Sequence, residues 1–232
     1  YTSDISSAAS DVYKRQGLFP VIEDQVLYDR VTGYGSAMWK AIGADEPASA
    51  MLAAGHREVY VYRFDWDEVP SNWLMDFQSL LGAAHGLEMP FVFYDVDNEM
   101  TYMPIDLIDE DNLAGAEPLA SAMSSYWGQF AHTGAPFRGR ANDLADWSRW
   151  HAEGNYMVFD TSADGGIRLQ HGALDRSGVF RKLALDSAAL GGQEGVCRAY
   201  TNLFGKDAIF SFSTACPNAS CAGSPGNFCP PP

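Results

Sequence analysis

The residues from Glu58 to Trp66 constrain the fold of this chain more than any other segment. Their sequence is EVYVYRFDW, in which bulky apolar and aromatic residues occupy nearly every position. A strand with one face in water alternates apolar and polar residues, whereas a nearly continuous run predicts a strand of a parallel sheet covered on both faces. A second short apolar run, Phe91–Tyr94, predicts the next strand.

Apolar residues at helical spacing predict helices before and after these strands. The expected helices are 21–39, 47–54, 118–130 and 173–190. Pro118 suits a first helical turn, and Thr133-Gly134 supplies a stop. Tyr156–Asp160 is expected to form a last short strand. The sequence therefore predicts an α/β fold with a mostly parallel sheet flanked by helices.

Charge and hydropathy limit the partners of this chain. Thirty acidic residues against fifteen basic ones give a net charge of −15, which disfavours nucleic acid and anionic membranes as partners. No run approaches the roughly 20 apolar residues that span a bilayer, and the N-terminus lacks the layout of a signal peptide. The length of 232 residues and an apolar content of 47% predict one sizeable core.

Four cysteines gather near the C-terminus, in a segment rich in Gly, Pro and Ser. They are Cys197, Cys216, Cys221 and Cys229. This crowding favours disulfides, with three possible pairings, and hence a secreted or periplasmic location. A zinc site is the alternative, although the spacings are not the C-x-x-C pairs that structural zinc prefers.

Both ends of the chain differ in composition from the middle. Residues 1–16 are rich in small polar residues and end in DVYKRQ, which resembles a translated adaptor, so we expect a non-native tail there. A disordered natural N-terminus is the alternative. The expected organisation is this tail, a folded portion over 17–195, and a Cys/Gly/Pro-rich tail over 196–232.

His85 is the candidate catalytic residue. It lies among small residues in the segment LGAAHGLEMPFVF, just before an apolar run. A histidine on such a turn has a rigid mount and a free imidazole edge, as a general base requires, whereas the alternative is a structural histidine.

Other polar side chains are expected to lie at the surface or to be structural. His56, His132, His151 and His171 show no metal-ligand spacing. Asp65, Asp67 and Glu68 follow the first strand and are interpreted as its solvated end.

Three motifs, taken in order, resemble the C-terminal part of the type-B carboxylesterase and cholinesterase family of α/β-hydrolases. They are Tyr60–Phe64, Gly82–Phe93, and the helix residues Leu119, Met123, Tyr126, Trp127 and Phe130 with the exit Thr133-Gly134 and Pro136. The resemblance covers about residues 21–159.

This resemblance implies roles for particular residues. His85 would be the triad histidine, which takes the proton of the nucleophilic serine and returns it to the leaving alcohol. Glu88 would be a buried partner behind the histidine, and Trp73, Met75 and Phe77 would help line an apolar pocket. The substrate would be a small ester, and the acyl-enzyme route needs no metal or organic cofactor.

Most of the catalytic machinery of such an enzyme is missing from the sequence. No G-x-S-x-G elbow occurs, and the closest string, Ala222–Gly226, lies after His85 instead of before it. The triad acid and the oxyanion loop would also precede these residues. We therefore expect a C-terminal fragment of a serine esterase that is inactive by itself.

Two alternatives remain open at this point. One is a non-catalytic cholinesterase-like binding or adhesion domain, in which the histidine loop persists without a working serine. The other is an unrelated acidic α/β domain. The sequence gives no indication of the oligomeric state.

Overall fold

The computed structural model describes residues 13–16, 19–22, 25–72, 76–97, 106–192, 195–197 and 199. The chain divides into two compact units: residues 1–43 with 174–232 form the first, and residues 44–173 form the second. The predicted boundaries at residues 16 and 195 stay predictions.

In the first unit, two of the described helices pack on each other. These are α2 (Gln25–Lys40) and α7 (Arg176–Leu185). Arg30 of α2 forms an ion pair of 2.7 Å with Asp186, and the Tyr34 hydroxyl donates to the same carboxylate at 3.1 Å. The expected helix 173–190 is thus confirmed with shorter bounds. The expected helix 21–39 is confirmed from Gln25 onward, but its start was wrong, because Val21 and Ile22 belong to a β-strand.

A β-hairpin lies at the start of the described residues. Strand β1 (Tyr13–Gln16) pairs antiparallel with β2 (Phe19–Ile22). The last residues of the expected non-native tail therefore form a strand, while residues 1–12 lie outside the described residues.

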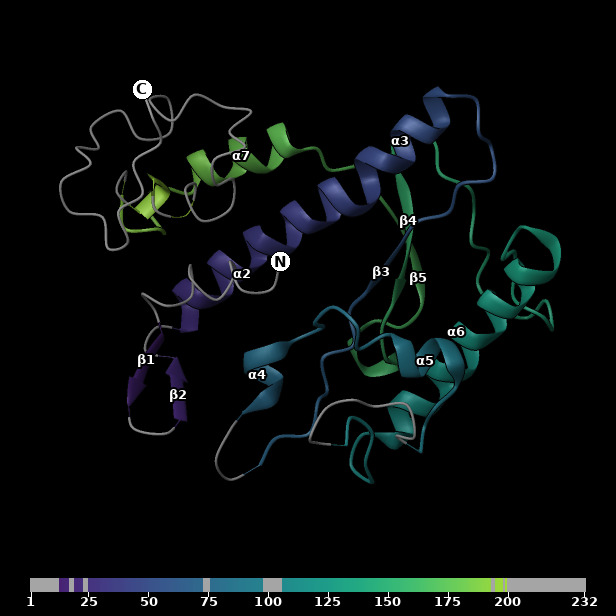
Figure 1. Ribbon diagram of the computed structural model, residues 1–232, viewed down its shortest axis with the longest axis horizontal. Coiled ribbons are helices and arrows are strands. Elements are labelled where there is room, and N and C mark those ends of the chain that lie inside the picture. The colour runs from purple at the N-terminus through teal and green to yellow at the C-terminus, as the bar shows by residue number, and fades with distance from the viewer. Residues whose placement is uncertain are drawn as a thin grey trace. The chain divides into compact units, whose positions relative to one another are not determined.

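The second unit contains a three-stranded mixed sheet in the order β3-β4-β5 (Figure 1). Strand β3 (Tyr62–Phe64) is parallel to β4 (Asn155–Phe159), and β4 is antiparallel to β5 (Arg168–His171). The short helix η2 (Ser162–Asp164) connects β4 to β5. These strands and the helices around them form a partial α/β fold.

Helices cover both faces of this sheet, as the run at Glu58–Trp66 predicts. On one face, α3 (Glu46–Ala53), which follows the π-helical η1 (Ala41–Asp45), packs against Val59, Val61 and Val158. On the other face lie α5 (Met89–Phe93) and the long α6 (Leu113–Thr133), which pack on each other (Figure 1).

An aromatic core fills the space between α6 and the sheet. Tyr126, Met157 and Phe159 are fully buried there, and Trp147 is 6% exposed. The Trp147 ring packs edge-to-face on Tyr126 and on Phe159, with centroid distances of 5.4 and 5.3 Å. Burial raises the pKa of Tyr126 to about 12, and its hydroxyl donates to the Ala145 carbonyl at 2.6 Å. Such closely packed rings make this core the stable centre of the second unit.

The expected strand at Phe91–Tyr94 is wrong, because this segment is helix α5. A short apolar run has no clear period and fits a strand or a buried helix equally well. Pro90 occupies the first turn of the helix, and Tyr94 adopts a left-handed conformation, with φ 58°, that ends it. Phe91 points into the core with 0% exposure, while Phe93 is 57% exposed, so only one face of α5 is buried.

Two further expectations need correction. The sheet is mixed and not mostly parallel, because β5 follows β4 as an antiparallel strand. The strand expected at Tyr156–Asp160 is confirmed as β4, one residue earlier at each end, but it is not the last strand. Helix α6 begins at Leu113, so Pro118 lies inside the helix and not in its first turn. The expected stop is confirmed, since Gly134 caps the helix in a left-handed conformation with φ 78°.

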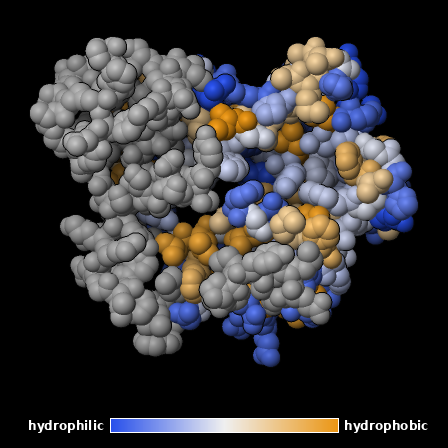
Figure 2. Space-filling view, in the orientation of Figure 1, coloured by the Kyte–Doolittle hydropathy of each residue, from blue (hydrophilic) through white to orange (hydrophobic). Residues whose placement is uncertain are grey.

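The surface of the described residues combines polar areas with hydrophobic patches, as Figure 2 shows. In the second unit the exposed large apolar side chains include Met89, Phe93, Tyr94, Phe130 and Phe137. Among the described helices, none has the length and apolar character that a membrane crossing requires.

Candidate active site

His85 lies on an exposed turn between two short helices of the second unit. Helix α4 (Phe77–Leu81) ends at Gly82, and α5 begins at Met89. Backbone bonds from Leu87 N–H to the Ala84 carbonyl (3.2 Å) and from Met89 N–H to the Gly86 carbonyl (3.3 Å) close the turn. The His85 side chain is exposed, as access to a substrate requires.

The turn is anchored in the core by residues close to His85. Leu87 is 4% exposed and Phe91, one helical turn later, is 0% exposed. The Phe91 ring contacts Phe64 and Trp66, with centroids 5.1 and 4.9 Å apart. Gly86 has φ +94°, a conformation that other residues rarely adopt. The backbone that carries His85 is therefore fixed from the side of β3.

The Glu88 side chain stabilises the turn that carries His85. Its carboxylate accepts a hydrogen bond of 2.8 Å from the N–H of Gly86, the residue next to His85. Glu88 is half-buried, and its negative charge adds to the effect of burial in raising the pKa of Tyr62 on β3. The Glu88 carboxylate thus acts on both the histidine turn and the neighbouring strand.

The candidate pocket residues and cysteines are only partly described. Phe77 is half-buried and packs on the aromatic core at the start of α4, whose N-terminus is capped by Asp76. Trp73 and Met75 lie outside the described residues. So do Cys216, Cys221 and Cys229, while Cys197 packs on a small apolar cluster around Leu183. Disulfides in this tail therefore stay a prediction.

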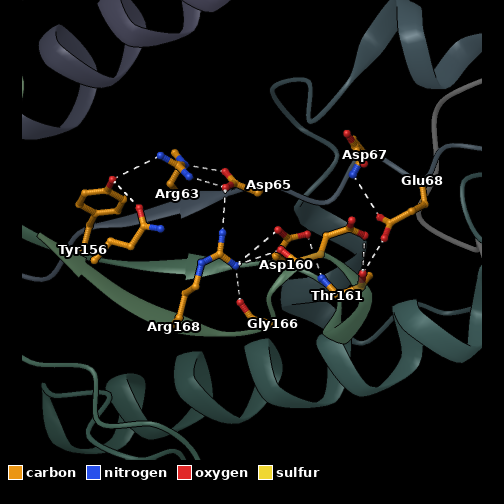
Figure 3. A network of polar contacts seen from close by, with 11 residues as sticks. Arg63, Asp65, Asp67, Glu68, Tyr156, Asp160, Thr161, Gly166 and Arg168 are labelled. Carbon is orange, nitrogen blue, oxygen red and sulfur yellow. Dashed lines mark hydrogen bonds and ion pairs between the residues drawn. The ribbon is translucent and has the colours of Figure 1, made fainter.

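A network of charged residues lies where the parallel strands β3 and β4 end (Figure 3). Asp65 accepts two hydrogen bonds from Arg63, of 2.6 and 2.5 Å. Arg168 on β5 lies between Asp160, at 3.5 Å, and Asp65, at 4.0 Å. The expectation that Asp65 lies at a merely solvated strand end is therefore wrong, because the fold pairs it with arginines.

Thr161 connects a second group of carboxylates to this network. Its hydroxyl lies 2.7 Å from Glu68 and 3.1 Å from Asp164. Ligand oxygens of Glu68, Asp160 and Asp164 lie within 4.8 Å of one another, a donor set that suits a hard cation such as Ca²⁺ or Mg²⁺. Arg168 already supplies positive charge beside Asp160.

Burial and like charges raise two carboxyl pKa values in this region. The pKa of Asp160 is raised mainly by burial and also by the charges of Asp65 and Asp164, against the lowering effect of Arg168 and the Thr161 N–H. The pKa of Asp67 is raised by burial and then by the charges of Asp160 and Asp164. In both cases the folded protein disfavours the charged form.

Asp67→Asn is expected to stabilise the second unit at neutral pH. A carboxyl with a raised pKa contributes its full stability only below its ordinary pKa and loses it as the pH rises through the raised value. Removing the charge should raise the free energy of unfolding near neutral pH by up to about 1 kcal/mol, the scale of solvent-screened interactions. The gain should shrink as the pH falls toward about 4, which urea unfolding at a series of pH values will measure.

Asp76→Asn is the matched control, because its shift has the opposite sign. Hydrogen bonds from the backbone and hydroxyl of Ser79 lower the pKa of Asp76, so its charged form stabilises the fold at neutral pH. This variant should be less stable than the parent chain at neutral pH. If both variants were more stable than the parent chain at neutral pH, the opposite effects assigned to the Asp67 and Asp76 charges would be contradicted.

The sheet brings together two histidines that sequence reasoning treated separately. The rings of His151 and His171 lie 5.9 Å apart between centroids, with an interplanar angle of 28°. The pairing of β4 with β5 aligns His171 opposite Asn155. The sequence holds one indication of this strand pairing. Gly165-Gly166 lies between Tyr156–Asp160 and Arg168–His171, and two glycines between short strands favour a turn and an antiparallel pair.

The second unit is thus a partial α/β domain with an exposed histidine turn, and the sequence is similar to that of an esterase. Over 108 residues, which are 46% of this chain and 18% of the relative, it is 30% identical to the para-nitrobenzyl esterase of Bacillus subtilis (strain 168). A solved structure of PNB esterase is 26% identical, with a TM-score of 0.33, and the match covers 49% of this chain and 19% of that one. No protein-family model matches the chain. The chain spans less than a fifth of the relatives it matches.

Proposed function

We propose that this chain is the C-terminal part of a serine carboxylic-ester hydrolase and supplies its catalytic histidine, His85. The observation that carries the proposal is the exposure of His85 on a turn fixed by buried neighbours. An imidazole held in this way can accept the proton of a serine hydroxyl and return it to the leaving alcohol without reorganisation of its backbone. The esterase similarity reported above supports this class of reaction.

Glu88 is proposed as a positioning residue for this histidine. Its carboxylate holds the peptide N–H of Gly86, and that bond fixes the backbone immediately after His85. Phe77, with Trp73 and Met75 upstream of it, is proposed to line the pocket for the apolar part of a small ester substrate.

The nucleophilic serine, the acid and the oxyanion donors are proposed to come from a segment outside this sequence. Strand β3 supports this division. It lies at the edge of the described sheet, yet the segment that leads into it packs on both sides, with Val59 and Val61 toward α3 and Tyr60 toward the aromatic core. Such two-sided packing is typical of interior strands of α/β sheets. A sheet that continues beyond β3 would give it that position.

Labelling with a fluorophosphonate tests the proposal. The 232-residue chain should show no stoichiometric serine adduct by mass spectrometry, because it has no nucleophile elbow. The full-length parent should be labelled at one serine before this segment. Stoichiometric labelling of the 232-residue chain would overturn the proposed division of the site, and an unlabelled parent would favour the non-catalytic binding domain.

A further inference from the structure

We propose that His151 and His171 form a two-imidazole site for a divalent transition-metal ion, separate from the esterase site. Neutral imidazole suits Zn²⁺, Cu²⁺ and Ni²⁺, in contrast to the oxygen ligands that Ca²⁺ and Mg²⁺ prefer. Both side chains are exposed, so water can complete the coordination shell.

The separation of the rings fits a shared ion. With metal–nitrogen bonds of about 2.0–2.1 Å and about 1.1 Å from each nitrogen to its ring centre, two imidazoles on one ion have centroids roughly 5.2 Å apart at a tetrahedral angle and roughly 6.4 Å apart at a linear one. The observed distance of 5.9 Å lies between these limits. Because the rings are stacked with an interplanar angle of 28°, their nitrogens do not yet converge, and binding requires both exposed side chains to rotate so that one nitrogen of each faces the ion.

One buried residue fixes both histidines. Asn155 is 1% exposed, and its side-chain oxygen accepts the N–H of His151 at 3.1 Å. Its side-chain nitrogen donates to the carbonyl and hydroxyl of Ser148, both at 3.1 Å. On β4, Asn155 is also the partner of His171 in the ladder with β5. The two backbones that carry the imidazoles are thus held in register before a metal binds, which lowers the entropy cost of binding.

The ladder continues past the histidines and strengthens this arrangement. The Gly172 N–H donates to the Gly154 carbonyl at 3.1 Å, and the Ala173 N–H donates to the Glu153 carbonyl at 3.2 Å. A bound ion would link the loop before β4 to the end of β5. Since it would bind the folded state and not the unfolded chain, it would also raise the apparent stability of the second unit.

Titration of the 232-residue chain with Ni²⁺ tests the site. Paramagnetic Ni²⁺ should first broaden the ring NMR signals of two of the five histidines in the sequence, those of His151 and His171. Because the second imidazole binds at high effective concentration, His151→Gln and His171→Gln should each weaken Ni²⁺ affinity about tenfold or more.

Exposed histidines elsewhere provide matched controls. His56→Gln and His132→Gln should leave the Ni²⁺ affinity within about twofold of the parent value, because a lone surface imidazole adds no chelation. The proposal fails if either His151→Gln or His171→Gln binds Ni²⁺ as tightly as the parent chain. It also fails if the first signals to broaden belong to other histidines.

Discussion

His85→Gln in the full-length parent is expected to lower kcat for ester hydrolysis by about ten-thousandfold or more, the scale of effect seen when a triad histidine is removed. Glutamine retains polar character but cannot take a proton from a serine hydroxyl. Because His85 is exposed and its turn is anchored by Leu87 and Phe91, the variant should fold like the parent. Steady-state kinetics with a chromogenic ester will measure the loss.

Two further variants distinguish catalysis from folding. His132→Gln replaces another exposed histidine, on α6, and should leave kcat unchanged. Glu88→Gln should cause a smaller loss than His85→Gln, because Glu88 acts only through the backbone of the turn. If His85→Gln and His132→Gln retain equal activity, His85 has no catalytic role.

Strand β3 and the residues that lead into it were predictable because their pattern has one physical explanation. Val59 and Val61 pack under α3, while Tyr60 and Tyr62 pack toward α6, so alternate residues of one segment enter two cores. Only a strand covered on both faces buries a continuous run in this way. Helix α6 was predictable for a similar reason, since its apolar residues recur at helical spacing over many turns.

The errors in the predicted fold arose where the local sequence pattern is short or weak. The segment MPFVF is apolar throughout, so only its tertiary contacts decide between helix and strand. Strand β5 has the sequence RLQH, with a single bulky apolar residue, and it depends on pairing with the buried β4. Pro118 favours a helix start, yet contacts of Ala116 and Leu119 with the core extend α6 toward the N-terminus.

In the candidate site, too, local features were predictable from the sequence and long-range contacts were not. His85 could be singled out from its neighbours because the small residues and the apolar run around it are local features. The pairing of Asp65 with Arg168, and of His151 with His171, depends on the β4–β5 ladder, which joins residues far apart in the sequence. Sequence spacing carries no information about such contacts until the strand partners are known.

Trp147→Ala is expected to lower the free energy of unfolding of the second unit by about 3 to 5 kcal/mol, the usual cost of truncating a buried large aromatic side chain. Besides Tyr126 and Phe159, its ring contacts Tyr62 and Trp127. Its indole N–H also donates to the Val61 carbonyl at 3.2 Å, beside β3. Truncation would therefore leave a cavity between α6 and the sheet. It would also remove one of the two hydrogen bonds that the Val61 carbonyl accepts, the other being from the Met157 N–H at 2.9 Å. Urea unfolding followed by far-UV circular dichroism will measure the change.

Two other substitutions separate the contributions of packing and hydrogen bonding. Trp147→Phe keeps much of the ring contact and loses only the N–H donor, so its cost should lie between those of the parent and Trp147→Ala. Trp39→Ala removes an equally large side chain that is 42% exposed and should cost less than about 1 kcal/mol. Equal losses for Trp147→Ala and Trp39→Ala would contradict the placement of Trp147 at the centre of the aromatic core, because a large side chain costs most where its neighbours cannot collapse into the space it leaves.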